Sequence, residues 1–174
     1  MRRNPVSDGD VCYGCDYFVD RSYVLVSSGT QGVVKFPGEV PNPGIDRAWL
    51  SLNLIWLPPS ESSVRIYGLG SSTAQLALSE LGAGSLLGTV RIPADNWSDV
   101  FLDVTDFVRG TPAAYLAFTL QSANGQAMAF SSLELNQGNP VQLILTQVPE
   151  PAHGALMFAG LLTLAGWLRR RASA

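Results

Sequence analysis

Few side chains in this sequence could take part in acid–base or nucleophilic chemistry. The chain of 174 residues has one histidine, His153, which stands in the C-terminal stretch beside Pro151. A serine or cysteine nucleophile needs a base such as histidine within hydrogen-bonding distance. The body of the chain offers no Ser–His or Cys–His pair, so the sequence disfavours nucleophilic catalysis and we expect a protein that is not an enzyme.

Carboxylates are the remaining groups that could do chemistry. Two of them suffice for a glycosidase, and the chain offers Asp99, Asp103, Asp106 and Glu134. We favour a structural role, because Asp103 and Asp106 flank Thr105 in a predicted turn where side-chain oxygens accept hydrogen bonds from backbone N–H groups. A calcium ion held by aspartate and backbone oxygens at this turn is an alternative. No other metal or cofactor is expected.

The two cysteines, Cys12 and Cys15, form a C-Y-G-C unit. A structural zinc ion needs two further ligands, and the chain has no third cysteine and no histidine in its body. The flanking sequences SDGDV and DYFVD are not typical of a thiol redox site at a helix N-terminus. A local disulfide in an exported protein and two free thiols both remain open.

Aromatic residues on the outer faces of strands could bind a sugar. Aromatic rings stack on the C–H faces of sugars, while amide and guanidinium groups bond to the hydroxyls. In the strand IDRAWLSLNL the outward residues are Trp49, Ser51 and Asn53, and the next strand, SVRIYGL, presents Arg65 and Tyr67. We expect these two strands to be adjacent. The candidate glycan platform is therefore Trp49, Asn53, Arg65 and Tyr67, and the alternative is that Trp49 packs beneath a loop or against the LPPSESS turn.

Strict alternation of apolar and polar residues predicts the strands that would position these side chains. It occurs in the two strands above and in SYVLVSS, GVVKF, AYLAFTLQS and VQLILTQ, with turn clusters such as LPPSESS and SANGQ between them. We expect seven or eight strands in an all-β fold, an antiparallel β-sandwich of the jelly-roll type. Residues 72–81 could form a short helix or a strand, and Trp56 should continue the inward face. The predicted core comprises Phe36, Leu50, Leu52, Val64, Ile66, Leu102, Val104, Leu116, Phe118, Leu120, Leu143 and Leu145.

Composition supports this fold and limits the partners. With 17 glycines, 11 prolines and 14% charged residues, the chain suits short strands joined by turns. A net charge of −3 gives no basic surface for nucleic acid. The N-terminal sequence MRRNPVSDGD has two arginines but no apolar segment after them, so it is not a secretory signal peptide. We expect the natural start to lie upstream.

The order of elements over residues 22–146 resembles the DNRLRE domain and related carbohydrate-binding modules, which are β-sandwiches. The resemblance implies a sandwich over residues 22–147, preceded by an N-terminal segment, 1–21, that holds a truncated first strand. The matching positions are Lys35 and Phe36, then Ala48, Leu50 and Leu52, then Asp103, Val104, Thr105 and Val108, then Phe130, Ser132 and Glu134, and finally Pro140, Gln142 and Leu143.

Residues 148–174 form a separate tail. The apolar stretch 152–168 has 17 residues, which as a helix would measure about 25 Å and could just span the ~30 Å hydrocarbon core of a bilayer. The arginines that follow it favour a cytoplasmic C-terminus; they are Arg169, Arg170 and Arg171.

The motif Pro149, Glu150 and Pro151 precedes this apolar stretch. Motif, apolar stretch and arginine cluster together resemble the PEP-CTERM sorting signal of Gram-negative bacteria. The resemblance implies recognition by an exosortase, cleavage near the motif, and transfer from the inner membrane to the cell surface. Species with this signal often make extracellular polysaccharide.

We therefore expect an exported, non-catalytic protein of the cell surface or extracellular matrix. Its partners would be an exosortase, transiently the inner membrane, and extracellular polysaccharide. The alternatives are a purely structural exoprotein with no small ligand and, third, a glycan-active enzyme.

Overall fold

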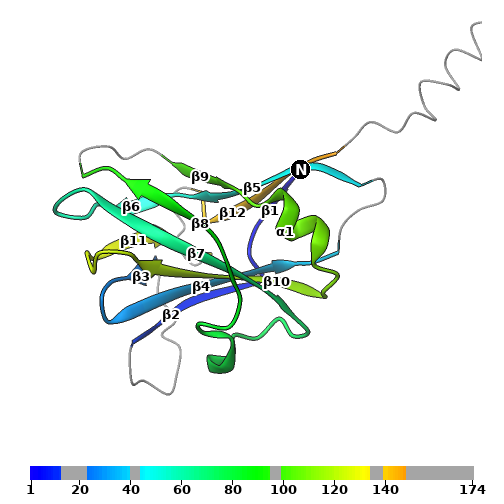
Figure 1. Ribbon diagram of the computed structural model, residues 1–174, viewed down its shortest axis with the longest axis horizontal. Coiled ribbons are helices and arrows are strands. Elements are labelled where there is room, and N and C mark those ends of the chain that lie inside the picture. The colour runs from blue at the N-terminus through cyan, green and yellow to red at the C-terminus, as the bar shows by residue number, and fades with distance from the viewer. Residues whose placement is uncertain (13–22, 40–43, 95–98, 134–138, 148–174) are drawn as a thin grey trace, which may run out of the picture.

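The computed structural model describes residues 1–12, 23–39, 44–94, 99–133 and 139–147. Its strands are antiparallel throughout and form two packed layers, with one short α-helix at the side (Figure 1). The predicted all-β class and the sandwich arrangement are confirmed. The apolar stretch 152–168 and the sorting motif lie outside the described residues.

One layer is a five-stranded sheet in the order β2-β4-β10-β7-β8. Side chains alternate across its strands as the sequence predicts: Val64 and Ile66 of β7 are buried between the layers, whereas Arg65 between them is exposed. The strands are β2 (Ser7–Cys12), β4 (Thr30–Pro37), β10 (Tyr115–Ser122), β7 (Ser62–Ser71) and β8 (Ser85–Ile92).

Two shorter sheets make up the other layer. Their orders are β1-β12-β5-β9 and β3-β11-β6. Only Asn53 separates β5 from β6, and the N–H of Ser131 donates to the Asn53 carbonyl oxygen at 2.9 Å, so the sheets adjoin at this point. The strands are β1 (Arg2–Arg3), β12 (Gln142–Gln147), β5 (Ile45–Leu52), β9 (Val100–Asp103), β3 (Tyr23–Val26), β11 (Met128–Ser131) and β6 (Leu54–Trp56).

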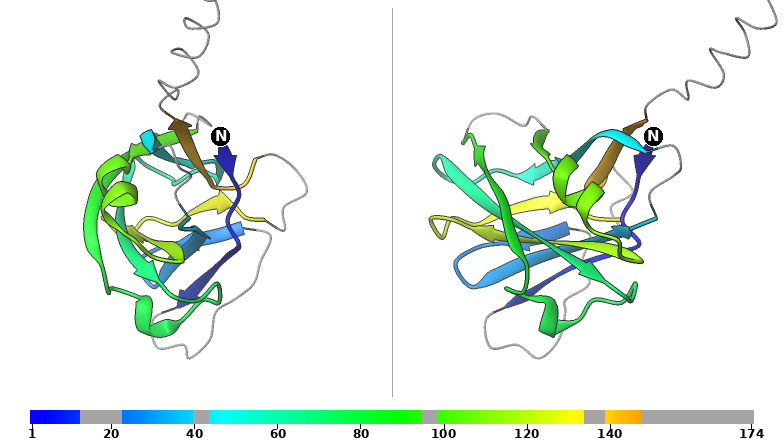
Figure 2. Two further views of the ribbon diagram at one scale, coloured as in Figure 1. Left: turned by 90° about the vertical axis from the view of Figure 1, so that its right-hand side faces the viewer. Right: turned by 45° about the vertical axis from the view of Figure 1, so that its right-hand side comes forward.

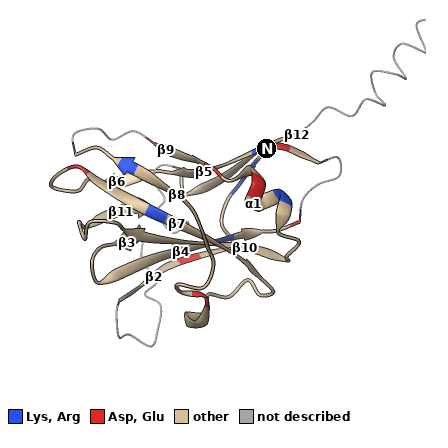
Figure 3. Ribbon diagram, viewed as in Figure 1, with Lys and Arg blue, Asp and Glu red and all other residues tan. Residues whose placement is uncertain are grey.

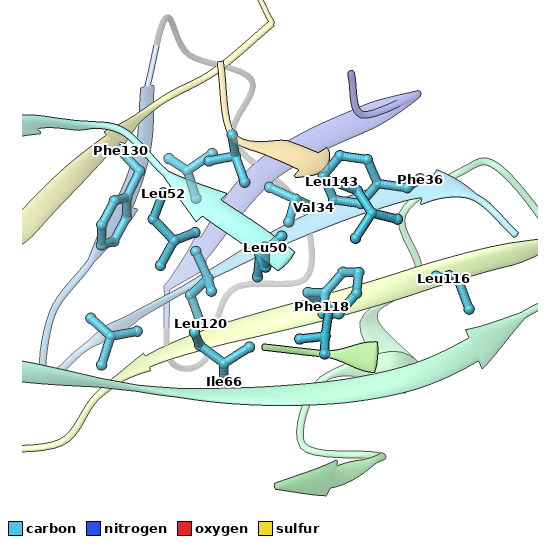
Figure 4. Close-up of a cluster of buried hydrophobic side chains, with 14 of the residues drawn as sticks. Val34, Phe36, Leu50, Leu52, Ile66, Leu116, Phe118, Leu120, Phe130 and Leu143 are labelled. Atoms are coloured by element: carbon cyan, nitrogen blue, oxygen red, sulfur yellow. The ribbon is translucent and has the colours of Figure 1, made fainter. Parts of the chain in front are cut away.

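The hydrophobic core lies between the layers (Figure 4). The ring of Phe118 packs edge-on against Phe36 and Phe107, with centroid distances of 5.8 and 5.4 Å. Every predicted core residue is buried except Leu102, which is partly buried. The reason is that β9 is an edge strand, so only one neighbouring strand shields Leu102 within its sheet.

The prediction for Trp56 was wrong, because its side chain is 54% exposed. The alternation of β5 continues past Asn53 to the buried Leu54, but the pairing of β6 with β11 shifts register between Ala129, opposite Trp56, and Phe130, opposite Leu54. A register shift changes which side of the sheet the following residues face. Trp56 consequently ends β6 facing solvent.

Residues 72–81 form neither the helix nor the strand that the sequence suggested. Only a 3₁₀ turn, η1 (Leu78–Glu80), is present. The ammonium group of the fully buried Lys35 accounts for this, since it donates to the carbonyl oxygens of Thr73 at 3.2 Å and Gln75 at 2.5 Å and pairs with Glu80 at 2.7 Å. To reach one ammonium group on the sheet, both carbonyl oxygens must point toward Lys35, whereas the carbonyl groups of an α-helix all point along its axis.

The N-terminal residues belong to the sandwich. β2 pairs with β4, and β1 pairs with β12, so strands begin well before residue 22. β12 therefore lies between β1 and β5, and the end of β12 lies next to the N-terminus, where the Met1 ammonium group donates to the Leu145 carbonyl oxygen at 2.6 Å (Figure 2). Another element that the sequence did not predict is α1 (Thr105–Gly110), which follows β9 directly.

Candidate functional site

Trp49 lies at the middle of the outer face of the β1-β12-β5-β9 sheet. Its neighbours Ala48 and Leu50 are buried in the core, so alternation directs the half-buried Trp49 away from it. Trp49 is directly opposite Ile144 on β12 and Asp103 on β9. The strand pairing thus aligns an aromatic, an aliphatic and an acidic residue in one row.

Phe101 is a second aromatic residue on this face, and the sequence reasoning did not select it. It pairs with Ser51, which makes it a diagonal neighbour of Trp49, and its side chain is 54% exposed. The sequence did contain this information, because the predicted inward position of Leu102 places its two neighbours, Phe101 and Asp103, on the outward side of the strand. We call Arg47, Trp49, Phe101, Asp103 and Ile144 the Trp49 face.

The predicted glycan platform does not exist as one surface. Arg65 and Tyr67 lie on β7, which pairs with β10 and β8 in the five-stranded sheet, and not with β5. The turn at residues 57–61 carries the chain from one layer to the other, so the outward residues of β5 and β7 lie on opposite outer faces of the sandwich. The side-chain amide of Asn53 is already engaged in a hydrogen bond within the protein, because it donates to Asp99 Oδ1 at 2.6 Å.

The turn after β9 orders the carboxylate of Asp103. Its Oδ1 accepts hydrogen bonds from the backbone N–H of Thr105 at 2.9 Å and from Thr105 Oγ1 at 2.5 Å. These bonds hold the pKa of Asp103 below its usual value, with a smaller contribution from the charges of Arg47 and Arg109. The predicted structural role is confirmed for Asp103, whose carboxylate satisfies the first turn of α1.

The calcium and disulfide expectations rest partly on residues outside the described ranges. Within those ranges, no three or more histidine, cysteine or acidic residues gather closely enough to hold a metal ion. Asp99 lies beside Asn53, whereas Asp106 stands in α1. Glu134 and Cys15 lie outside the described residues, and Cys12 ends β2. The pairing of the cysteines stays a prediction.

Two hollows lie near α1. One is a groove of about 640 Å³ next to Asp103, with charged and apolar walls. The other, of about 580 Å³, is mainly apolar and is bordered by Ile45, Val108 and Pro112. The first borders the Trp49 face through Arg47 and Asp103, which makes this end of the sandwich the best-formed candidate site.

The tail residues assigned to sorting fall outside the described residues; they are Pro149, Glu150, Pro151, Arg169, Arg170 and Arg171. In the part of the chain that the structure describes, no helix has the length and apolar character needed to cross a membrane.

Comparisons with family models and with curated proteins found no match: no family model matches this chain, and no curated protein matches it.

Proposed function

We propose that this protein is an exported, non-catalytic module of the cell surface or extracellular matrix that binds polysaccharide through the Trp49 face. The observation that carries the binding proposal is the arrangement of Trp49 and Phe101 as diagonal neighbours on the outer face of one sheet. Sugar rings present flat C–H faces, and aromatic side chains on a sheet match them in shape and polarity.

The surroundings of Trp49 suit a ligand that is rich in hydroxyl groups. Asp103 offers a carboxylate directly opposite the indole, and the exposed Arg47 offers donors two residues away on the same strand face. Half-burial of Trp49 against its neighbours restricts its rotamers, which lowers the entropy cost of binding. A restrained aromatic ring flanked by donors and acceptors is what a carbohydrate surface requires.

The sorting part of the proposal rests on the sequence of the tail. The order Pro149, Glu150, Pro151, then an apolar stretch, then three arginines supports processing by an exosortase. The precursor would reside in the inner membrane, and the cleaved body, a jelly-roll-like sandwich of the DNRLRE type, would reach the cell surface or matrix.

Substitution of Trp49 tests the binding proposal. Trp49→Ala should weaken binding to extracellular polysaccharide by about 1–3 kcal/mol, as expected for the loss of a central aromatic residue. Affinity electrophoresis in gels containing the polysaccharide measures the effect, and the melting temperature shows whether the variant is folded.

Trp56→Ala is the matched control, because Trp56 is 54% exposed and lies on β6 of another sheet. It should leave binding unchanged. If both folded variants bind as the wild type does, the Trp49 face is not the site, and the purely structural exoprotein becomes the better proposal.

A further inference from the structure

The groove beside the Trp49 face has the features of a ligand subsite. It is formed by the start of β5, the start of β8, the end of β9 and α1, and its volume of about 640 Å³ falls in the range of small-molecule pockets. We call it the α1 groove. Its lining comprises Asp46, Arg47, Leu86, Leu87, Asp103, Val104, Thr105, Asp106, Phe107 and Arg109.

Its charged walls are fixed by bonds to the fold. Arg109 donates from Nε to the Ile45 carbonyl oxygen at 2.9 Å and from Nη2 to the Asp46 carbonyl oxygen at 2.6 Å, which ties α1 to β5. Thr105 joins the two elements again, because the N–H of Ala48 donates to its hydroxyl oxygen at 2.9 Å. The carboxylate of Asp103, which is bonded to Thr105, is therefore held in place before any ligand arrives.

The groove carries both signs of charge, with an excess of carboxylates. Asp46, Asp103 and Asp106 stand against Arg47 and Arg109, and two N–H groups of Arg109 are already used by carbonyl groups. Figure 3 shows this mixture on α1, which bears an acidic and a basic residue. The excess of carboxylates disfavours an anionic ligand, and among the described residues no three or more histidine, cysteine or acidic residues gather closely enough to hold a metal ion.

The remaining walls are apolar. Leu86 is 54% exposed at the start of β8, while Leu87 and Phe107 are partly buried and pack against the core. A ligand that fits must therefore offer hydroxyl groups to Asp103 and Arg47 and an apolar face to Leu86. A neutral pyranose ring has hydroxyl groups around its edge and an apolar C–H face.

We propose that the α1 groove binds one neutral sugar unit of the polysaccharide that contacts the Trp49 face. Asp103 and Arg47 belong to both surfaces, and Asp103 is directly opposite Trp49 in the sheet, so one chain of sugars can contact the indole and enter the groove. This inference rests on the proposed function and adds to it the selection of neutral over acidic sugars.

Titration calorimetry with neutral gluco-, manno- and galacto-hexasaccharides and with an oligogalacturonate tests the inference. Asp103→Asn keeps an acceptor for Thr105 but removes the charge, and Arg47→Gln removes an exposed guanidinium. Each should weaken binding of a neutral hexasaccharide about tenfold, the amount expected for a hydrogen bond to a charged group. Arg91→Gln is the control, since Arg91 pairs with Glu61 away from the groove.

The two proposals fail differently. If Trp49→Ala abolishes binding while Asp103→Asn and Arg47→Gln bind as the wild type does, the groove is not a subsite and only the Trp49 face stands. Tighter binding of the oligogalacturonate than of every neutral hexasaccharide overturns the inferred selectivity. If the wild type binds none of the oligosaccharides, both proposals fall. If the Asp103→Asn variant does not fold, the affinity of the Arg47→Gln variant for the neutral hexasaccharide decides whether the groove is a subsite.

Discussion

Asp103 and Lys35 show how single charged residues are used in two ways in this sandwich. Asp103 is exposed at the rim of the groove, where its free oxygen can meet a ligand. Lys35 is fully buried on the outer side of the five-stranded sheet, where Glu80, Ser71 and two backbone carbonyls surround its ammonium group. The exposed Asp103 is suited to ligand binding, whereas the buried Lys35 holds residues 71–80 against the sheet.

Glu80→Gln should destabilise the protein. Breaking a buried ion pair costs about 3 kcal/mol or more, because it leaves an uncompensated charge, and Lys35 has 0% exposure. Urea unfolding of the variant measures the change. A loss below about 0.5 kcal/mol would contradict the role given to this pair.

The same pair predicts an acid sensitivity. Burial opposes ionisation of Glu80, but hydrogen bonds from Lys35 and Ser71 and the charge of Lys35 outweigh it and hold the pKa of Glu80 below its ordinary value. A lowered folded-state pKa gives stability that is present above the unfolded-state pKa and is lost as the pH falls through the folded-state pKa. Unfolding free energies should therefore drop below about pH 4, and this drop should be smaller in Glu80→Gln than in the wild type.

At the scale of elements, β10 is the central strand of the larger sheet and carries the aromatic centre of the core. Phe118→Ala should cost about 3–5 kcal/mol of stability, because its ring is fully buried between Phe36 and Phe107. Chemical denaturation measures the loss.

Phe101→Ala is the matched control, because Phe101 is exposed on the edge strand β9. It should cost less than about 1 kcal/mol of stability. Equal losses for the two variants would mean either that Phe101 faces the core or that Phe118 does not.

Local alternation predicted the strands and their inward faces well, since burial of one face is a property of neighbouring residues in the chain. It could not predict which strands pair, because pairing depends on contacts between distant segments. For that reason the sequence predicts Arg65 and Tyr67 beside Trp49, whereas β7 in fact lies in the other layer. Neither the helix nor the strand suggested for residues 72–81 is present, for a similar reason: the carbonyl oxygens of Thr73 and Gln75 bond to the distant Lys35.

At the scale of the whole molecule, the two outer faces of the sandwich differ in what they expose. Residues 71–80 lie against the outer side of the five-stranded sheet, fastened through Lys35 and through the bond from Ser7 Oγ to the Ala74 carbonyl oxygen at 2.5 Å. The opposite outer face presents Trp49, Phe101 and the rim of the α1 groove. This asymmetry assigns the proposed binding to one face only.

Hydrogen–deuterium exchange with and without saturating polysaccharide tests that assignment most directly. Binding at the Trp49 face and the α1 groove should slow exchange in β5, in β9 and in α1 and leave β7 and β10 unchanged. Slower exchange confined to β7, where Arg65 and Tyr67 lie, or no change in any strand at saturation, would contradict it.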